Sequence, residues 1–176
     1  MHFASASSQW KILRNNMKKL FLIRHAKSDW TNPELKDSER FLNERGYSNA
    51  NMMASKFKYK TDLIITSPAI RAISTALIFA RNINYNSNNI FIKQELYESS
   101  VKEYLDVIHE IDNAFDTILL FAHNPTISDL AQQLTHALPM ELPTCAIVGI
   151  NFDVSDWKKV KEGDLFLFDY PKKNQS

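Results

Sequence analysis

Hydrophobic residues in this chain gather into short continuous runs that alternate with stretches of helical periodicity. Four runs predict buried strands: KKLFLIR (18–24), DLIITS (62–67), NIFIK (89–93) and TILLFAH (117–123). Continuous apolar runs of this length are typical of strands that are covered on both faces. Two further runs, at 146–154 and 164–170, predict strands that pair near one edge of the sheet.

Helices are predicted between these strands, because three segments carry apolar residues three or four positions apart, the spacing of one helical face. These residues are Met52, Met53 and Phe57 within 47–58; Ile70, Ile73, Leu77 and Ile78 after Pro68; and Val101, Tyr104, Leu105, Ile108 and Ile111. A fourth helix is predicted to open at Asn124-Pro125. Strands that alternate with helices imply a three-layer α/β/α sandwich with a mainly parallel sheet.

The length and composition predict one globular domain. The chain has 176 residues, of which 44% are hydrophobic and 23% are charged, so it can build a full core. We expect a single domain over residues 17–176. Residues 1–16 lack a strong pattern and precede a second methionine, Met17, so we interpret them as an N-terminal extension.

Charge and cysteine content exclude several classes of function. The 21 basic and 20 acidic residues leave a formal net charge of +1, whereas nucleic-acid or anionic-membrane binding depends on an excess of clustered lysine and arginine. No apolar run approaches the ~18 residues that cross a bilayer. The one cysteine, Cys145, can form neither an intramolecular disulfide nor a structural zinc site. We therefore expect a cytoplasmic protein with no nucleic-acid or membrane partner.

Arginine and histidine follow the ends of three predicted strands. Arg24 and His25 follow the first strand. Arg71 lies one helical turn beyond the second strand, and His123 follows the fourth. Ligands of parallel sheets bind outside the carboxyl ends of the strands. We therefore expect these four side chains to converge on one site.

Two guanidinium groups beside two imidazoles indicate a site for phosphate rather than for a metal ion. A divalent cation held by two histidines would be joined by carboxylates, and guanidinium groups would repel it. Phosphate oxygens accept paired hydrogen bonds from arginine, and a neutral imidazole can attack phosphorus and carry the phosphoryl group. The sequence thus predicts phosphoryl-transfer chemistry.

Competing motifs are incomplete. Lys27-Ser28 has the ending of a P-loop without its glycines, and no GxSxG of a serine hydrolase is present. Cys145 lacks the arginine that a cysteine-phosphatase loop places six residues further on. We therefore expect Cys145 to be a buried structural residue.

Five segments together resemble the histidine phosphatase, or phosphoglycerate-mutase-like, superfamily. They are LFLIRHAKSDW, FLNERG, SPAIRAISTA, ELYES and FAHNP, and the similarity runs from about Met17 to Asp169. The chain is most similar to the small branch of SixA-type phosphohistidine phosphatases. The resemblance implies an α/β fold of the phosphoglycerate mutase type and an enzyme that needs no metal or organic cofactor.

The resemblance also implies roles for the predicted site residues. His25 matches the nucleophile that accepts the phosphoryl group, and Arg24 matches its phosphate-binding neighbour. Arg71 matches the second phosphate-binding arginine, and His123 matches the second histidine of the pocket. Arg40 matches a position that reaches the phosphate in the small branch.

The resemblance leaves two candidates for the proton donor. Larger members of the family have an acidic residue in a Leu-X-Glu pattern, which Leu96-Tyr97-Glu98 matches, and Glu95 is a competing candidate. Some phosphohistidine phosphatases lack this acid, because the phosphoramidate bond is already labile. Ala26 and Ala122 replace glycines that are common in the family, and neither change removes a catalytic group.

We therefore expect a phosphatase that acts through a phosphohistidine on His25, with protein phosphohistidine as its substrate. A phosphatase of small phosphorylated metabolites is the first alternative. A catalytically inactive phosphate-binding module is the second. The expected partner is a phosphorylated protein or a small phosphoester, and the sequence predicts no oligomeric state.

Overall fold

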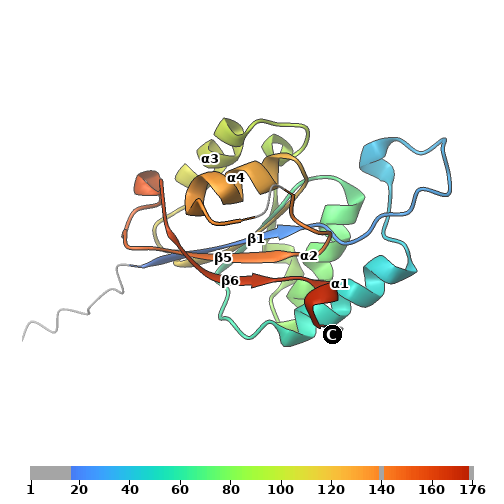
Figure 1. Cartoon of the computed structure of the whole chain (residues 1–176), viewed down its shortest axis with the longest axis horizontal. Coiled ribbons are helices and arrows are strands. Elements are labelled where there is room, and N and C mark those ends of the chain that lie inside the picture. The colour runs from blue at the N-terminus through green and yellow to red at the C-terminus, as the bar shows by residue number, and fades with distance from the viewer. Residues whose placement is uncertain (1–16, 139–140, 175–176) are drawn as a thin grey trace, which may run out of the picture.

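The chain folds around one six-stranded sheet with the strand order β3-β2-β4-β1-β5-β6 (Figure 1). This computed structural model describes residues 17–138 and 141–174, so the predicted extension over residues 1–16 lies outside the described residues. The strands are β1 (Lys18–Arg24), β2 (Leu63–Thr66), β3 (Ile90–Ile92), β4 (Thr117–Ala122), β5 (Ile147–Phe152) and β6 (Asp164–Asp169).

The predicted strand pairing is confirmed. Strands β3, β2, β4 and β1 are parallel to one another. Strand β5 is antiparallel to both β1 and β6 and lies with β6 at one side of the sheet. The sheet is therefore mainly parallel, and its last two strands pair at an edge as their apolar runs predict.

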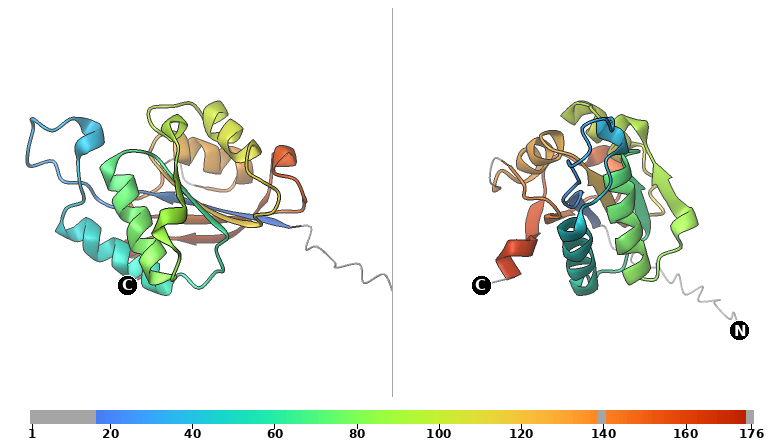
Figure 2. Two further views of the ribbon diagram at one scale, coloured as in Figure 1. Left: turned by 180° about the vertical axis from the view of Figure 1, so that it is seen from behind. Right: turned by 90° about the vertical axis from the view of Figure 1, so that its right-hand side faces the viewer.

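Helices cover both faces of the sheet and complete the three layers (Figures 1 and 2). The α-helices of the described residues are α1 (Glu44–Lys56), α2 (Ile70–Asn82), α3 (Val101–His109) and α4 (Thr126–Thr135). Short 3-10 turns are η1 (Asp37–Glu39), η2 (Ser87–Asn89), η3 (Gln94–Leu96), η4 (Trp157–Lys159) and η5 (Pro171–Asn174). Helices α1 and α2 pack on one face of the sheet, and α3 and α4 pack on the other.

Strand β1 lies at the centre of both cores, which explains its continuous apolar sequence. Leu20 and Leu22 face α3 and α4, whereas Phe21 and Ile23 face α1 and α2. All four side chains are fully buried. Because successive side chains of a strand point to opposite faces, only a strand covered on both sides is apolar at every position. Arg24 and His25 are thus carried out of the core at the strand's carboxyl end.

Two details of the predicted helices are wrong. Helix α1 begins at Glu44 rather than at residue 47, because Asn43 caps it: the Asn43 Oδ1 accepts a hydrogen bond from the Gly46 N–H at 2.8 Å. In α2, Ile70 and Leu77 are 42% and 44% exposed. The buried face of α2 instead consists of Arg71, Ala72, Thr75, Ala76, Phe79 and Ala80. Small side chains on this face let α2 lie close to the sheet and let Arg71 face inward.

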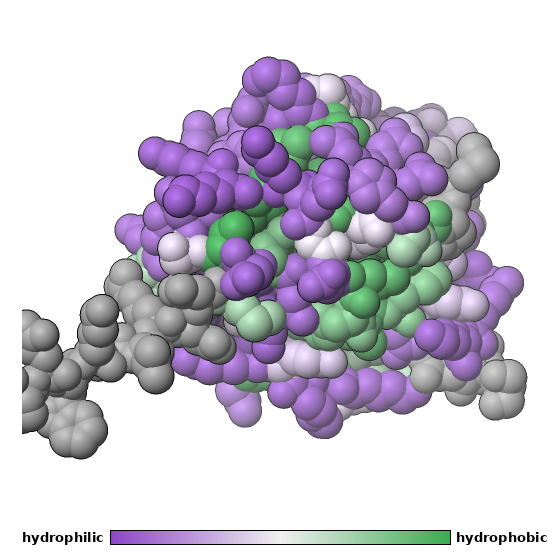
Figure 3. All heavy atoms as spheres, turned by 60° about the vertical axis from the view of Figure 1, so that its left-hand side comes forward, coloured by the Kyte–Doolittle hydropathy of each residue, from purple (hydrophilic) through white to green (hydrophobic). Residues whose placement is uncertain are grey.

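One face of the molecule combines hydrophilic and apolar areas (Figure 3). On the face shown in Figure 3, hydrophobic residues form a band that hydrophilic side chains surround. Within residues 17–138 and 141–174, no helix has the length and apolar character that crossing a membrane requires.

Candidate active site

The parallel register of β2, β4 and β1 brings the predicted residues to one edge of the sheet. Arg24 at the end of β1 pairs with Ala122 at the end of β4. The His25 N–H donates to the Ala122 carbonyl at 3.1 Å, and the Ser67 N–H donates to the Phe121 carbonyl at 3.0 Å. The rings of His25 and His123 consequently lie side by side, with centroids 5.0 Å apart.

His25 is held as a neutral imidazole with one free lone pair. Its Nδ1 lies 2.7 Å from the Ala26 carbonyl oxygen, and because a carbonyl only accepts, Nδ1 must carry the proton. Burial, together with the nearby charges of Arg71 and Arg24, lowers the pKa of His25 to about 4. At neutral pH the Nε2 lone pair is therefore available to attack an electrophile.

His123 is positioned by Ser67. Its Nε2 lies 2.6 Å from the Ser67 hydroxyl, while the Ala69 N–H donates to the same oxygen at 3.4 Å. Burial and the neighbouring His25 and Arg71 lower the pKa of His123 to about 3, so the ring is neutral. If Ser67 donates to Nε2, the proton of His123 is on Nδ1, which is buried without a hydrogen-bond partner.

Arg71 reaches the same edge from the first turn of α2 and is only 6% exposed. Its Nη2 lies 2.6 Å from the Asp37 Oδ2, and its Nη1 donates to the Asp37 carbonyl. The Tyr97 hydroxyl donates to the same carboxylate at 2.9 Å. Partial burial opposes ionisation of Asp37, but the hydrogen bonds from Arg71 and Tyr97 outweigh it and lower the pKa of Asp37. The Arg71 guanidinium, which the sequence predicts to bind phosphate, is thus paired with a carboxylate of the protein itself.

Two polar atoms at this edge of the sheet are buried without a hydrogen-bond partner. Arg24 donates through Nη1 to the Leu142 carbonyl at 2.5 Å and pairs with Glu141 at 3.6 Å. Its Nε is buried without a hydrogen bond, as is the His123 Nδ1. Unpaired buried donors cost stability unless a ligand satisfies them. Both belong to predicted phosphate-binding residues.

Arg40 is not brought into contact with these groups. Its guanidinium stacks on the Trp30 ring at 4.1 Å, and its Nη1 donates to the Asn32 carbonyl at 3.2 Å. Its Nε is another buried atom without a partner. The role of Arg40 in phosphate binding stays a prediction.

Of the two candidate proton donors, the structure places Glu98 at the site. Arg71, Tyr97, His123 and Glu98 are among the residues that line a cavity of about 450 Å³. Glu98 is exposed and has a left-handed backbone, with φ of 53°. Glu95 lies within η3 and does not line this cavity.

The loop that carries His25 is held by α1 and α2. The Thr75 hydroxyl accepts from the Ala26 N–H at 3.0 Å and donates to the Arg71 carbonyl at 2.7 Å. At Gly46 in α1, an added Cβ would lie 2.1 Å from the Lys27 carbonyl oxygen. Only glycine therefore allows α1 to approach this loop so closely.

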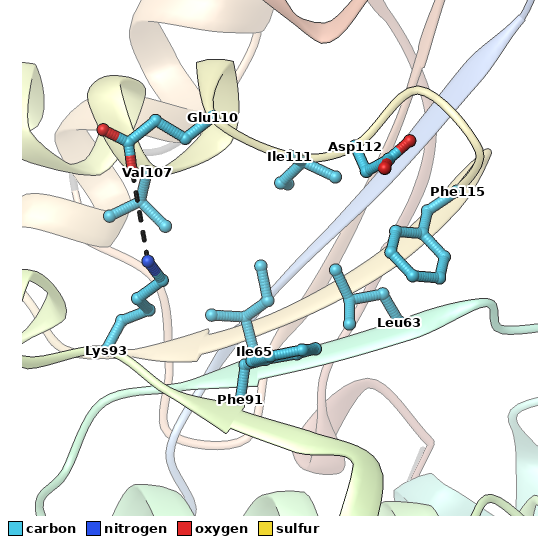
Figure 4. Close-up of a pocket in the computed structure, with 9 residues that line it drawn as sticks. All are labelled: Leu63, Ile65, Phe91, Lys93, Val107, Glu110, Ile111, Asp112 and Phe115. Carbon is cyan, nitrogen blue, oxygen red and sulfur yellow. Dashed lines mark ion pairs between the residues drawn. The ribbon is translucent and has the colours of Figure 1, made fainter.

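Other candidate chemistries do not fit the structure. Burial raises the pKa of the Cys145 thiol to about 12, so its thiolate is not available at neutral pH. In the described part of the chain, no group of three or more His, Cys, Asp or Glu side chains is arranged to hold a metal ion. A separate hollow of about 210 Å³ between α3 and the β2–β3 strands is mainly apolar (Figure 4). A Lys93–Glu110 ion pair at 4.0 Å lies among its lining residues, which do not include His25, Arg71 or His123.

Three residues of the site were not predicted from the sequence. Ser67 stands directly before Pro68 at the end of β2, so its place at a strand end was the available signal. Asp37 and Tyr97 come from η1 and from the residue that follows η3. Neither segment has a hydrophobic period, and no local pattern indicates which way their side chains point.

We expect acid to destabilise this protein through the two buried histidines. Both have folded-state pKa values, about 4 and about 3, below the ordinary 6.5. Below 6.5 the unfolded chain binds protons that the folded chain does not, so stability falls as pH drops toward 4. At about pH 5 the loss is on the order of 2 kcal/mol per histidine relative to about pH 7, measurable by urea unfolding.

The His25→Gln variant serves as the comparison. It lacks one of the two titrating imidazoles, so its free energy of unfolding should change less between about pH 7 and about pH 5 than that of the natural protein. The same change in both proteins would contradict a buried neutral His25.

Comparisons with known proteins agree with this geometry. A sequence profile of the histidine phosphatase superfamily (branch 1) matches residues 20–114. Comparison with curated proteins gave no match. Among solved structures, SixA from Agrobacterium tumefaciens is 26% identical with a TM-score of 0.73, and the alignment covers 88% of this chain and 98% of that one.

Two other solved structures share the fold at lower identity. The protein histidine phosphatase SixA complexed with tungstate is 20% identical, with a TM-score of 0.76 and coverage of 89% of this chain and 99% of that one. The mycobacterial glucosyl-3-phosphoglycerate phosphatase is 15% identical, with a TM-score of 0.64 and coverage of 88% and 99%.

Proposed function

The chain belongs to the histidine phosphatase superfamily, and we propose that it hydrolyses phosphorylated substrates through a covalent phosphohistidine on His25. The observation that carries this proposal is the neutral His25, whose Nδ1–H is bound to the Ala26 carbonyl and whose Nε2 is left for attack. Its ring lies beside that of His123, and Arg71 is close enough to shift its pKa.

The proposed reaction has two steps. The Nε2 lone pair of His25 forms a bond to phosphorus, and the bond from phosphorus to the leaving group breaks with its electron pair on the leaving atom. Water then attacks the phosphohistidine, the P–N bond breaks, and inorganic phosphate and neutral His25 result. The Arg24 Nε is buried without a partner and would donate to a phosphoryl oxygen in each step. The His123 Nδ1, also buried without a partner, would donate likewise in the tautomer in which Ser67 donates to Nε2.

Arg71 needs a rearrangement before it can take part. Its guanidinium is paired with Asp37 in this structure, so an incoming phosphoryl group must displace that carboxylate or share the guanidinium with it. The Asp37 side chain is 42% exposed, so a displaced carboxylate would turn toward solvent as its hydrogen bonds with Arg71 and Tyr97 break. Asp37 would thereby keep Arg71 oriented while the site has no substrate.

Protein phosphohistidine is the substrate that we propose. Support comes from the likeness to SixA of Agrobacterium tumefaciens and from the fold shared with the protein histidine phosphatase SixA. The alternative, a small phosphoester, is favoured by one specific observation. Glu98 lines the cavity beside His123, and an alkoxide leaving group needs a proton donor more than an imidazole does.

The Glu98→Gln variant shows how far the turnover of each substrate depends on a proton donor at Glu98. We expect it to reduce kcat for an alkyl phosphate such as glycerol phosphate by about a hundredfold, because proton donation to the leaving oxygen is lost. Turnover of a phosphohistidine-containing protein should change by less than about threefold, because imidazole departs from phosphorus without that help. Both rates are measured by release of inorganic phosphate.

The matched control is Glu95→Gln, which removes a carboxylate outside the cavity and should leave both rates unchanged. The proposal of protein phosphohistidine fails if the natural protein prefers the alkyl phosphate in kcat/KM. Phosphatase function itself fails if the folded protein releases phosphate from neither substrate nor from p-nitrophenyl phosphate.

A further inference from the structure

A second hollow at the carboxyl edge of the sheet is lined by positively charged side chains. Its volume is about 420 Å³, and its walls come from the end of β1, from α1, and from the segments before β5 and after β6. The charged residues are Arg24, Lys27, Arg45 and Lys172. None of the described residues that line it carries a carboxylate, whereas Asp37 and Glu98 line the cavity beside His123.

Three of these four charges have no ion-pair partner within the described part of the chain. Lys27, Arg45 and Lys172 form no ion pair with a described residue, although the chain has almost equal numbers of acidic and basic residues. Among residues 17–138 and 141–174, Glu141 is the carboxylate that forms an ion pair with one of the four, namely with Arg24 at 3.6 Å. A concave surface lined by charges of one sign concentrates its electrostatic potential and attracts ions of opposite sign.

This hollow adjoins the proposed site of phosphoryl transfer. Arg24 lines it and directly precedes His25, and Lys27 follows His25 by two positions. The Lys27 carbonyl accepts from the Asn43 N–H at 3.0 Å and packs against Gly46, so the lysine stands on a fixed part of the loop. The hollow therefore contains Arg24, which the proposed site also uses, and Lys27, which follows the reacting histidine by two positions.

We propose that this hollow binds a second anionic group, a phosphate or a carboxylate, carried by the same substrate. The proposal rests on the proposed function, because it takes the first phosphoryl group to be at His25. Arg45 and Lys172 belong to the hollow alone, whereas Arg24 also belongs to the phosphoryl site. Substrates with an anionic group away from the scissile bond are thus selected over substrates with one phosphoryl group only.

Matched substrate pairs test this selection. Fructose 1,6-bisphosphate is compared with fructose 6-phosphate, and a phosphohistidine peptide flanked by glutamates is compared with the same peptide flanked by glutamines. The first pair places the second anion on a small molecule, and the other places it on a protein. We expect a lower KM for the more anionic member of at least one pair, and the pair that responds identifies the source.

The double variant Arg45→Gln, Lys172→Gln should remove this preference. Exposed charge pairs each contribute a factor of up to about five, so the preference should fall by about five- to twentyfold. The kcat/KM for p-nitrophenyl phosphate should stay unchanged, because it has no second anion. The control is Lys58→Gln, Lys161→Gln, which removes two exposed charges outside the hollow and should leave every value unchanged.

Binding measured by calorimetry with the same compounds separates the two proposals, because it does not require turnover. A protein that binds the more anionic compound more tightly without turning it over contradicts the proposed function alone. If the protein hydrolyses phosphate compounds but both members of each pair show equal KM and equal affinity, the proposed second anion site is overturned. A preference that the double variant retains in full also overturns it.

Discussion

Replacement of His25 by alanine is expected to lower kcat by at least about a thousandfold for every phosphorylated substrate. No other described group near the site offers a comparable nucleophile: His123 is bound to Ser67 through Nε2, and the Cys145 thiol is buried with a pKa of about 12. Water alone would have to attack the substrate in the variant. Release of phosphate from p-nitrophenyl phosphate measures the effect.

The control for this substitution is His136→Ala. His136 is exposed and pairs with Glu162 at 3.4 Å after the end of α4, so the variant should keep full activity. Circular dichroism checks that both variants fold. The natural protein, quenched in alkali during turnover, should carry an acid-labile phosphoryl group on His25. Undiminished turnover by folded His25→Ala would remove His25 as the nucleophile.

The sheet could be predicted from the sequence because its strands are covered on both faces. Leu20 to Ile23 are apolar without interruption since each must fill a core, and such a run has no competing interpretation as a loop. The buried face of helix α2 could not be predicted from its apolar pattern, because several of its large hydrophobic residues are not among the residues that it buries. Ile70 and Leu77 suggested one face, but Ala72 and Ala76 are the residues against the core. The size of a hydrophobic side chain therefore does not predict its burial where a helix packs closely against a sheet.

The site could be predicted only where it depends on strand ends. His25 and His123 meet because β1 and β4 are parallel neighbours with Arg24 opposite Ala122. The order of apolar runs predicts that parallel strands end at one edge of the sheet, but it does not predict which strands are neighbours. Asp37 reaches Arg71 from an irregular segment that extends from the sheet before turning back through η1 (Figure 1). The direction of a side chain in such a segment depends on long-range contacts, which a local pattern does not contain.

Replacement of Arg71 by alanine is expected to lower kcat/KM by about a hundred- to a thousandfold, the loss typical when one group that stabilises transition-state charge is removed. Arg71 is nearly buried, and its guanidinium lies close enough to lower the pKa of both histidines. Arg71→Lys should recover only part of this loss, because an ammonium cannot give the paired hydrogen bonds of a guanidinium. Inhibition by inorganic phosphate should weaken in both variants.

Asp37→Asn is the control that separates phosphate binding from structural support. It breaks the same 2.6 Å ion pair from the other side and leaves the guanidinium in place. If the pair matters only for folding, Arg71→Ala and Asp37→Asn should be equally harmful. If Arg71 binds the phosphoryl group and Asp37 competes for it, inorganic phosphate should inhibit Asp37→Asn more strongly than the natural protein. Equal inhibition constants for inorganic phosphate in the natural protein, Arg71→Ala and Asp37→Asn would contradict a phosphate-binding role for Arg71.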